Sequence, residues 1–310
     1  MTPKDKNPLR LGTRGSALAR TQSEQIAADL RRLSPDERFE TVIIKTTGDV
    51  QIEGPLSRLA GKGFFTKEIE EALLDGRIDL AIHSLKDLPT ELPDGLEIGA
   101  IPRREDPRDA LIGQALGPGS RIGTSSLRRA SQLRMLYPGC TVCELRGNLD
   151  TRISKVKSGA YDSAVVAAAG LLRLGRQSEI TQLMDPARFL PAPGQGALAI
   201  EIRKGDRRTA EVVRRVHSEE TERCVGAERA FLSRLGSGCQ VPVGALAKIS
   251  GGTLALRGRV VSLDGTQVLE GEESGPSADA ARAGERLAER LLKQGAAKII
   301  RSIELNSGRS

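Results

Sequence analysis

Apolar runs bounded by turn residues alternate along most of the chain with longer stretches whose apolar positions repeat at helical spacing. The short runs predict buried strands, and the longer stretches predict amphipathic helices that pack on them. Such an alternation is typical of an α/β fold. The expected strands are 9–13, 39–46, 79–83, 96–101, 121–123, 141–145 and 163–168, and the expected helices are 16–33, 66–75, 126–136 and 149–157.

The last part of the chain has a different pattern, which predicts a smaller α+β domain. Its apolar runs are short and follow one another closely, with Asp264-Gly265 as the turn of a hairpin. The expected elements are a helix over 218–235, hairpin strands between 241 and 271, and a helix over 277–293.

Two segments that contain proline are expected to cross between α/β units. Glu105–Arg108 is the first and Leu190–Gly194 the return. A faint repeat, in which Gly12–Leu18 and Gly123–Leu127 both close a strand and open a helix, suggests two related lobes, although chance explains it equally well. The expected domains are residues 1–102 completed by 195–217, residues 103–194, and residues 218–310.

Composition and charge limit the classes of function. With 47 basic and 40 acidic residues the chain carries a net charge of +7, so an anionic partner is expected. Nucleic acid, anionic lipid and a small polyacid all remain open. Aromatic residues make up only 2% of the chain, which argues against a base-stacking platform for single-stranded nucleic acid. No apolar run approaches the ~20 residues of a membrane span, and we expect a cytoplasmic protein.

The four cysteines are too few for a disulfide scaffold in a chain of this length. Cys140 and Cys143 form a C-x-x-C, but positions three apart on a predicted strand face opposite ways, so we expect no metal site. Cys239 lies in a glycine-rich loop where a thiol is reachable, yet composition alone favours an inert cysteine.

A hydroxyl-rich turn, Gly123–Ser126, precedes a predicted helix that begins with Arg128 and Arg129. Backbone N–H groups at a helix N-terminus favour an anion. Arg14, Arg146 and Arg152 also follow predicted strands, where ligands of open α/β sheets bind. The alternative is an ordinary serine N-cap with solvated arginines.

Lys86 and Asp87 lie beyond the end of another predicted strand, before a proline-marked turn. A carboxylate among cations stays ionised and can stabilise a developing positive charge. A functionless surface ion pair explains the same residues equally well.

Together, these segments resemble the porphobilinogen deaminase family, also called hydroxymethylbilane synthases, over roughly residues 10 to 301. The motifs that carry the resemblance are Thr13-Arg14-Gly15-Ser16, Gly61-Lys62-Gly63, His83-Ser84-Leu85-Lys86-Asp87, Glu105-Asp106-Pro107-Arg108-Asp109, Gly123-Thr124-Ser125-Ser126-Leu127-Arg128-Arg129, Leu145-Arg146-Gly147-Asn148 with Thr151-Arg152, Pro193-Gly194-Gln195-Gly196 and Gly238-Cys239-Gln240-Val241-Pro242. One departure is Thr47, which stands where some relatives have Arg.

The resemblance implies a fold of two lobes similar to type II periplasmic binding proteins, hinged around a cleft, and a smaller C-terminal domain. It implies a dipyrromethane cofactor attached to Cys239 through a thioether, and Asp87 as the catalytic carboxylate. The implied cofactor contacts are Ser84, Lys86, Thr124, Ser126, Arg128, Arg129, Arg146 and Gly147, and the implied substrate contacts are Arg14, Ser16, Lys62, Arg152, Arg173 and Gln195.

The implied reaction is the deamination of porphobilinogen and the head-to-tail joining of four units on the cofactor, after which water releases hydroxymethylbilane. Loss of ammonia builds positive charge on the pyrrole, and Asp87 can stabilise it. Each ring brings an acetate and a propionate, whose burial requires paired cations. The resemblance thus implies a monomer whose partner is porphobilinogen, with no nucleic acid and no membrane.

A noncatalytic binding protein of the same lobed fold remains the main alternative, because fold alone does not determine function. Such a binder needs neither Asp87 nor a tether at Cys239. A basic nucleic-acid binder is the second alternative, and it predicts an affinity that falls steeply with salt.

Overall fold

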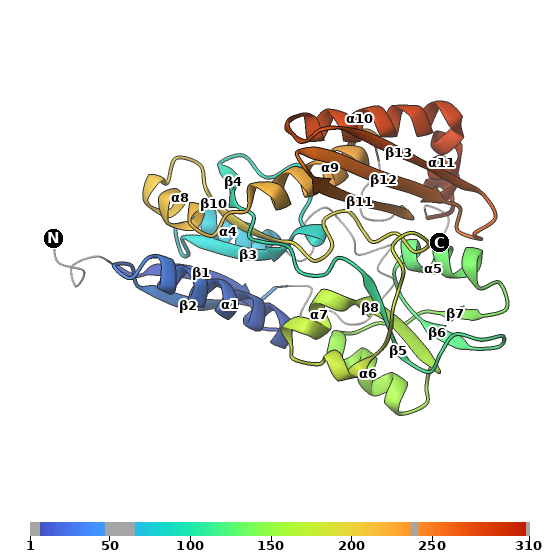
Figure 1. The fold of residues 1–310 in the computed structure, drawn as a ribbon. Helices are drawn as coiled ribbons and strands as arrows, with labels where there is room; N and C mark the ends of the chain where they lie inside the picture. The colour runs from blue at the N-terminus through green and yellow to red at the C-terminus, as the bar shows by residue number, and fades with distance from the viewer. Residues whose placement is uncertain (1–6, 47–65, 237–240, 308–310) are drawn as a thin grey trace. The chain divides into compact units, whose positions relative to one another are not determined.

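The computed structural model describes residues 7–46, 66–236 and 241–307. The chain divides into two compact units, residues 1–104 with 197–221 and residues 105–196 with 222–310 (Figure 1). Within the described residues, no helix is both long and apolar enough to cross a membrane.

The first unit contains a five-stranded sheet of order β2-β1-β3-β10-β4. β1 pairs in parallel with β2 and β3, whereas β10 is antiparallel to β3 and β4. The strands are β1 (Leu9–Arg14), β2 (Phe39–Ile44), β3 (Leu80–Ser84), β4 (Leu96–Ala100) and β10 (Leu198–Arg203), and the helices are α1 (Ala17–Leu33), α4 (Lys67–Leu74), the 3-10 turn η2 (Leu85–Asp87) and α8 (Arg207–Arg214).

Successive residues of β3 place apolar side chains on both faces of this sheet, as expected for a buried strand. Leu80 and Ile82 pack in a core with residues of α1 and α8. Ala81, between them, packs on the other face with residues of α4. The first unit therefore has three layers, with the sheet between helices.

The second unit repeats this arrangement in a sheet of order β7-β6-β8-β5-β9. β6 is parallel to β7 and β8, and β5 is antiparallel to β8 and β9, so strand order and directions match those of the first sheet. The elements are β5 (Asp109–Gly113), β6 (Arg121–Gly123), α5 (Leu127–Leu136), β7 (Thr141–Cys143), α6 (Leu149–Lys157), β8 (Ser163–Ala167), α7 (Ala168–Arg173), the 3-10 turn η3 (Gln177–Glu179) and β9 (Ile180–Leu183).

The faint sequence repeat corresponds to equivalent positions in the two sheets. Ser16 caps α1 after β1 and accepts the N–H of Ala19 at 3.3 Å. Ser126 caps α5 after β6 and accepts the N–H of Arg129 at 3.4 Å. A serine hydroxyl satisfies an otherwise unpaired helix donor in both places.

The C-terminal part of the second unit is a three-stranded antiparallel sheet covered by helices. Phe231 is fully buried in its core, and α10 lies along the sheet (Figure 1). The elements are α9 (Glu219–Arg234), β11 (Val243–Ser250), β12 (Thr253–Val261), β13 (Val268–Pro276), the 3-10 turn η4 (Ser277–Asp279), α10 (Ala280–Leu291), the π-turn η5 (Leu292–Ala296) and α11 (Ala297–Ser307).

Every strand and helix expected from the sequence is present, and most ends lie within three residues of those expected. The last hairpin strand, β13, extends beyond the expected end at Gly271 to Pro276, and the last helix begins after the 3-10 turn η4 and is followed by the π-turn η5. Gly295, with a φ of 115°, separates α10 from α11. Several elements were not expected. They are β5, β9, β10, α7, α8 and α11.

The two crossing segments lie side by side at their ends in the second unit. The N–H of Glu105 donates to the carbonyl of Gly196 at 3.2 Å. A Cβ on Gly196 would lie 2.5 Å from the carbonyl oxygen of Glu105, and the φ of Gly196 is +87°. Only glycine fits this position without strain.

Candidate functional site

Two predicted site residues, Thr124 and Ser126, follow the end of β6 in the second unit. Thr124 is buried, and its N–H donates to the carbonyl of Cys143 at 2.9 Å. Its hydroxyl accepts the N–H of Ser126 at 3.2 Å, and Ser126 in turn caps α5. This turn therefore fixes where α5 begins, at the carboxyl end of the parallel strands, where ligands of such sheets bind.

Arg128 and Arg129, in the first turn of α5, both bind the carboxylate of Asp109. Arg128 Nη1 is 2.7 Å from Asp109 Oδ2, and Arg129 Nη2 is 2.7 Å from Asp109 Oδ1. All three side chains are buried. Two guanidinium groups facing one carboxylate leave one positive charge in excess. We call these residues the Asp109 cluster.

Backbone carbonyls complete the hydrogen bonding of the Asp109 cluster. Arg128 Nη1 donates to Leu190 O at 2.7 Å, and Arg129 Nη1 donates to Val165 O at 3.1 Å. Arg128 Nε is buried and has no hydrogen-bond partner among the described residues. The Asp109 cluster therefore has an excess positive charge and one donor that the described part of the chain leaves unsatisfied.

Burial and the neighbouring charges act in opposite directions on the pKa values of the Asp109 cluster. Burial alone would raise the pKa of Asp109, but the charges of Arg128 and Arg129 hold it well below its usual range. Burial lowers the pKa of Arg128, against the opposing effect of Asp109. The carboxylate therefore stays ionised near neutral pH.

Gln195 and Arg173 join the return segment to the same region. Gln195 is fully buried, and its Nε2 donates to Pro107 O at 2.8 Å and to Asp109 Oδ1 at 3.0 Å. Arg173 Nη2 donates to Gly196 O at 2.8 Å, and burial lowers the pKa of Arg173. The structure therefore brings Gln195 together with Arg128 and Arg129.

Arg146 and Gly147 lie between β7 and α6, and Arg152 lies in the first turn of α6. Arg146 forms an ion pair with Glu144, in which Arg146 Nε lies 2.7 Å from Glu144 Oε1. Arg152 Nε donates to Gly147 O at 2.9 Å, and its Nη2 donates to Ser125 Oγ at 3.3 Å. Arg152 thus links the start of α6 to the turn that precedes α5.

Ser84, Lys86 and Asp87 lie at the end of β3 in the first unit. Ser84 Oγ is 3.3 Å from Nε2 of the buried Gln22. Lys86 is half-buried and Asp87 is exposed, both on η2. The 3-10 turn therefore presents the Asp87 carboxylate to solvent just beyond a strand end.

Arg14 and Ser16 lie at the equivalent position after β1. Arg14 is the last residue of β1, and Ser16 is the N-cap of α1. Both are half-buried. Lys62 and Cys239, the remaining predicted site residues, lie outside the described residues, as does Thr47.

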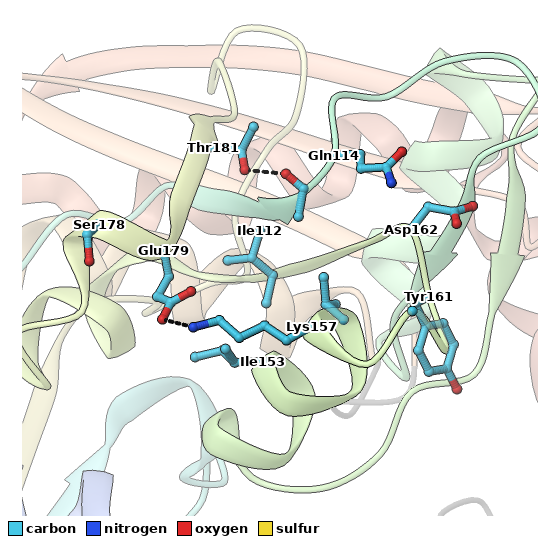
Figure 2. Close-up of a pocket in the computed structure, with 12 residues that line it drawn as sticks. Ile112, Gln114, Ile153, Lys157, Tyr161, Asp162, Ser178, Glu179 and Thr181 are labelled. Atoms are coloured by element: carbon cyan, nitrogen blue, oxygen red, sulfur yellow. Dashed lines mark hydrogen bonds and ion pairs between the residues drawn. The ribbon is translucent and has the colours of Figure 1, made fainter.

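A separate pocket of about 450 Å³ lies at the opposite end of the second sheet, around Gly113 and Asp162 (Figure 2). Lys157 Nζ pairs with Glu179 at 2.7 Å beside it, and Thr181 donates to Gly113 O at 2.5 Å (Figure 2). Asp162 and Tyr161, which also line it, bind Arg121 and Glu144 outside the pocket. None of the predicted site residues that the structure describes lines this pocket.

Sequence reasoning did not identify Asp109 as a site residue. It stands in a run of charged residues that reads as a crossing segment. The available signal was an aspartate immediately before the apolar run Ala110–Ile112, because a carboxylate at the start of a buried strand needs a cationic partner. Of the two cysteines of the C-x-x-C, Cys140 Sγ donates to Gly117 O at 3.1 Å and Cys143 Sγ lies 3.9 Å from Thr141 O.

Comparisons with known proteins agree over nearly the whole chain. The family model described as porphobilinogen deaminase, dipyromethane cofactor binding domain, matches residues 9–211, and that of the C-terminal domain matches residues 222–293. Porphobilinogen deaminase of Syntrophobacter fumaroxidans is 47% identical, covering 95% of this chain and 97% of that protein. That of Syntrophus aciditrophicus is 49% identical, covering 96% and 99%.

A solved periplasmic solute binding protein from Desulfovibrio salexigens is 12% identical, with a TM-score of 0.40 over 69% of this chain and 73% of that chain. A TM-score of this size does not establish a common fold. The sequence relatives and the family models carry the conclusion: the chain belongs to the porphobilinogen deaminase family.

Proposed function

We propose that this chain deaminates porphobilinogen and joins four units head to tail on a dipyrromethane attached to Cys239, releasing hydroxymethylbilane by hydrolysis. The observation that carries the proposal is the Asp109 cluster, which lies within the region matched by the cofactor-binding family model. Its excess positive charge is buried, so it favours an anionic group over water.

The chemistry of the Asp109 cluster fits a cofactor with carboxylate side chains. Arg128 Nε is a buried donor that no described residue pairs with, and a guanidinium binds carboxylates through two donors at once. When bound, a dipyrromethane supplies the pyrrole carbon to which the first substrate unit is joined. The residues that would hold its acid groups are Arg128, Arg129, Thr124, Ser126, Arg146, Gly147, Ser84 and Lys86.

Asp87 is the residue proposed to act on the reacting pyrrole. Its carboxylate is exposed at a strand end and can approach the ring that gains positive charge as ammonia leaves. Arg14, Ser16, Lys62, Arg152 and Arg173 would bind the acid groups of the substrate and the growing chain. Gln195 was predicted to contact substrate, and its burial against Asp109 favours an indirect role.

We further propose that the protein acts in the cytoplasm as a monomer, with porphobilinogen as its small-molecule partner and no nucleic acid. The described cysteines Cys140, Cys143 and Cys224 are free thiols, as a reducing compartment favours.

The test is to incubate the purified protein with porphobilinogen and to assay uroporphyrin after oxidation, together with the mass of the intact protein. We expect uroporphyrin and a dipyrromethane adduct that Cys239→Ser lacks and that Cys140→Ser retains. An active protein with a bare Cys239 thiol would refute the tether. A noncatalytic binder would instead bind porphobilinogen without releasing ammonia.

A further inference from the structure

Glu228, on α9, is a fully buried carboxylate that joins two segments far apart in the sequence. Its Oε2 accepts the N–H of Gly194 at 2.7 Å, and its Oε1 accepts the N–H of Ala247 at 2.8 Å. Gly194 belongs to the return segment and Ala247 to β11. A buried carboxylate requires such donors, and each bond to it is stronger than one between neutral groups.

The return segment continues this path to the Asp109 cluster. Gln195 follows Gly194, and its Nε2 donates to Asp109 Oδ1 at 3.0 Å. Asp109 in turn binds Arg128 and Arg129. An unbroken buried path therefore runs from β11 through Glu228, the return segment and Asp109 to the arginine pair, all within the second unit.

A second route joins the C-terminal sheet to α5 without Glu228. Arg259, on β12, donates through Nη1 to Gln132 Oε1 at 3.0 Å and to Arg188 O at 2.5 Å. Gln132 also exchanges two hydrogen bonds of 2.9 Å with Leu190. Because this route does not involve Glu228, the contact between the C-terminal sheet and α5 should survive the loss of one hydrogen bond at Glu228.

We propose that Glu228 is a positioning residue for the cofactor, because it fixes the return segment between β11 and the Asp109 cluster. This inference rests on the proposed function. β11 begins at Val243, shortly after Cys239 in the sequence, so the strand that follows the proposed tether and the arginines that would hold the cofactor are both attached to Glu228. Glu228 contributes by holding other groups in place, and it is not itself a catalytic residue.

Glu228→Gln tests this role with little change in volume. A glutamine has one acceptor oxygen and one amide donor, so it can accept from Gly194 or from Ala247 but must turn its NH₂ toward the other N–H. The segment whose N–H loses its acceptor, either the return segment or β11, can then shift by a short distance. Displacements of about 1 Å can lower a catalytic rate by up to about 10²-fold. Glu289→Gln is the matched control, because Glu289 pairs with Arg234 at the exposed surface of the same domain.

The experiment follows the gain of dipyrromethane mass when apoprotein is incubated with porphobilinogen, and then kcat and KM of the loaded protein. For Glu228→Gln we expect loading and kcat to fall by about 10- to 100-fold, with KM within about threefold of wild type. Glu289→Gln should match wild type in all three. If Glu228 had only a structural role, Glu228→Gln would lower the melting temperature and leave loading, kcat and KM unchanged.

Wild-type loading and kcat in Glu228→Gln would overturn the inference, whatever its melting temperature. If that variant does not fold cooperatively, Glu228→Asp decides, because it keeps the charge and shortens the reach: slow loading supports the inference and wild-type loading overturns it. Failure of wild-type protein to gain the adduct would instead refute the proposed function.

Discussion

Asp87 and Asp109 are aspartates in opposite surroundings. Asp87 is exposed at the end of a 3-10 turn, whereas Asp109 is fully buried between two guanidinium groups. An accessible carboxylate such as Asp87 can stabilise a cation that forms during a reaction. A buried carboxylate with paired cations, such as Asp109, instead orients those partners. The sequence alone pointed to Asp87, Arg128 and Arg129. It did not show that Asp109 binds both arginines, because that contact depends on how β5 packs beside α5.

Asp87→Asn is predicted to keep the fold and to lose at least ~10²-fold in kcat, since the amide has no charge to stabilise a cationic pyrrole. Turnover of porphobilinogen and circular dichroism measure the two effects. Asp94→Asn, at another exposed aspartate of the first unit, should match wild type in both. Near-normal turnover in Asp87→Asn would remove this carboxylate from the mechanism.

Elements with long periodic patterns were predictable, as were the short strands β3, β6 and β8, whereas β5 and β10 were not. α1 and α9 are long enough for their apolar spacing to show. β5 begins in a charged crossing segment and β10 follows a proline- and glycine-rich one, so neither stands out locally. Both are antiparallel to the neighbouring parallel strands of their sheets. β5 is placed there by the first crossing segment and β10 by the return segment, and neither placement shows in the local sequence.

Two helix glycines of the C-terminal domain should respond to alanine with opposite signs. In α9, a Cβ on Gly226 would meet nothing within 4 Å, so Gly226→Ala should stabilise by about 0.5–1 kcal/mol through backbone entropy. In α10, a Cβ on Gly284 would lie 2.2 Å from Ala227 O, so Gly284→Ala should destabilise by about 1–3 kcal/mol. Urea unfolding measures both, and equal signs would contradict the close contact of α9 and α10.

At the scale of the whole molecule, the two five-stranded sheets share one strand order and one set of directions. The sequence carried only a faint trace of this, in the two serine-capped turns after β1 and β6. Many sequences satisfy the same pattern of buried positions, so the two sheets can share an order of strands without sharing residue identities. Each sheet also places most of its predicted site residues after parallel strands, and strand-end reasoning located several of them, including Arg14, Asp87 and Arg128.

The stability of the molecule should depend on pH through carboxylates that guanidinium groups hold ionised. Burial alone would raise the pKa of Asp79, but hydrogen bonds from Arg10 and Arg203 hold it below its usual range. A depressed carboxylate stabilises the fold above its unfolded pKa of about 3.9, and this contribution is lost as the pH falls through the lower folded value.

Asp79→Asn should therefore lower the free energy of unfolding by about 1.5–3 kcal/mol near neutral pH. The difference from wild type should narrow as the pH falls below about 4, because the wild-type carboxyl then also becomes neutral. Asp75→Asn is the control, since Asp75 pairs with Arg77 at the surface and its replacement should change the free energy by less than about 0.5 kcal/mol. Urea unfolding across this pH range measures both variants, and a difference for Asp79→Asn that stays constant down to the lowest pH would show that the charge of Asp79 does not stabilise the fold.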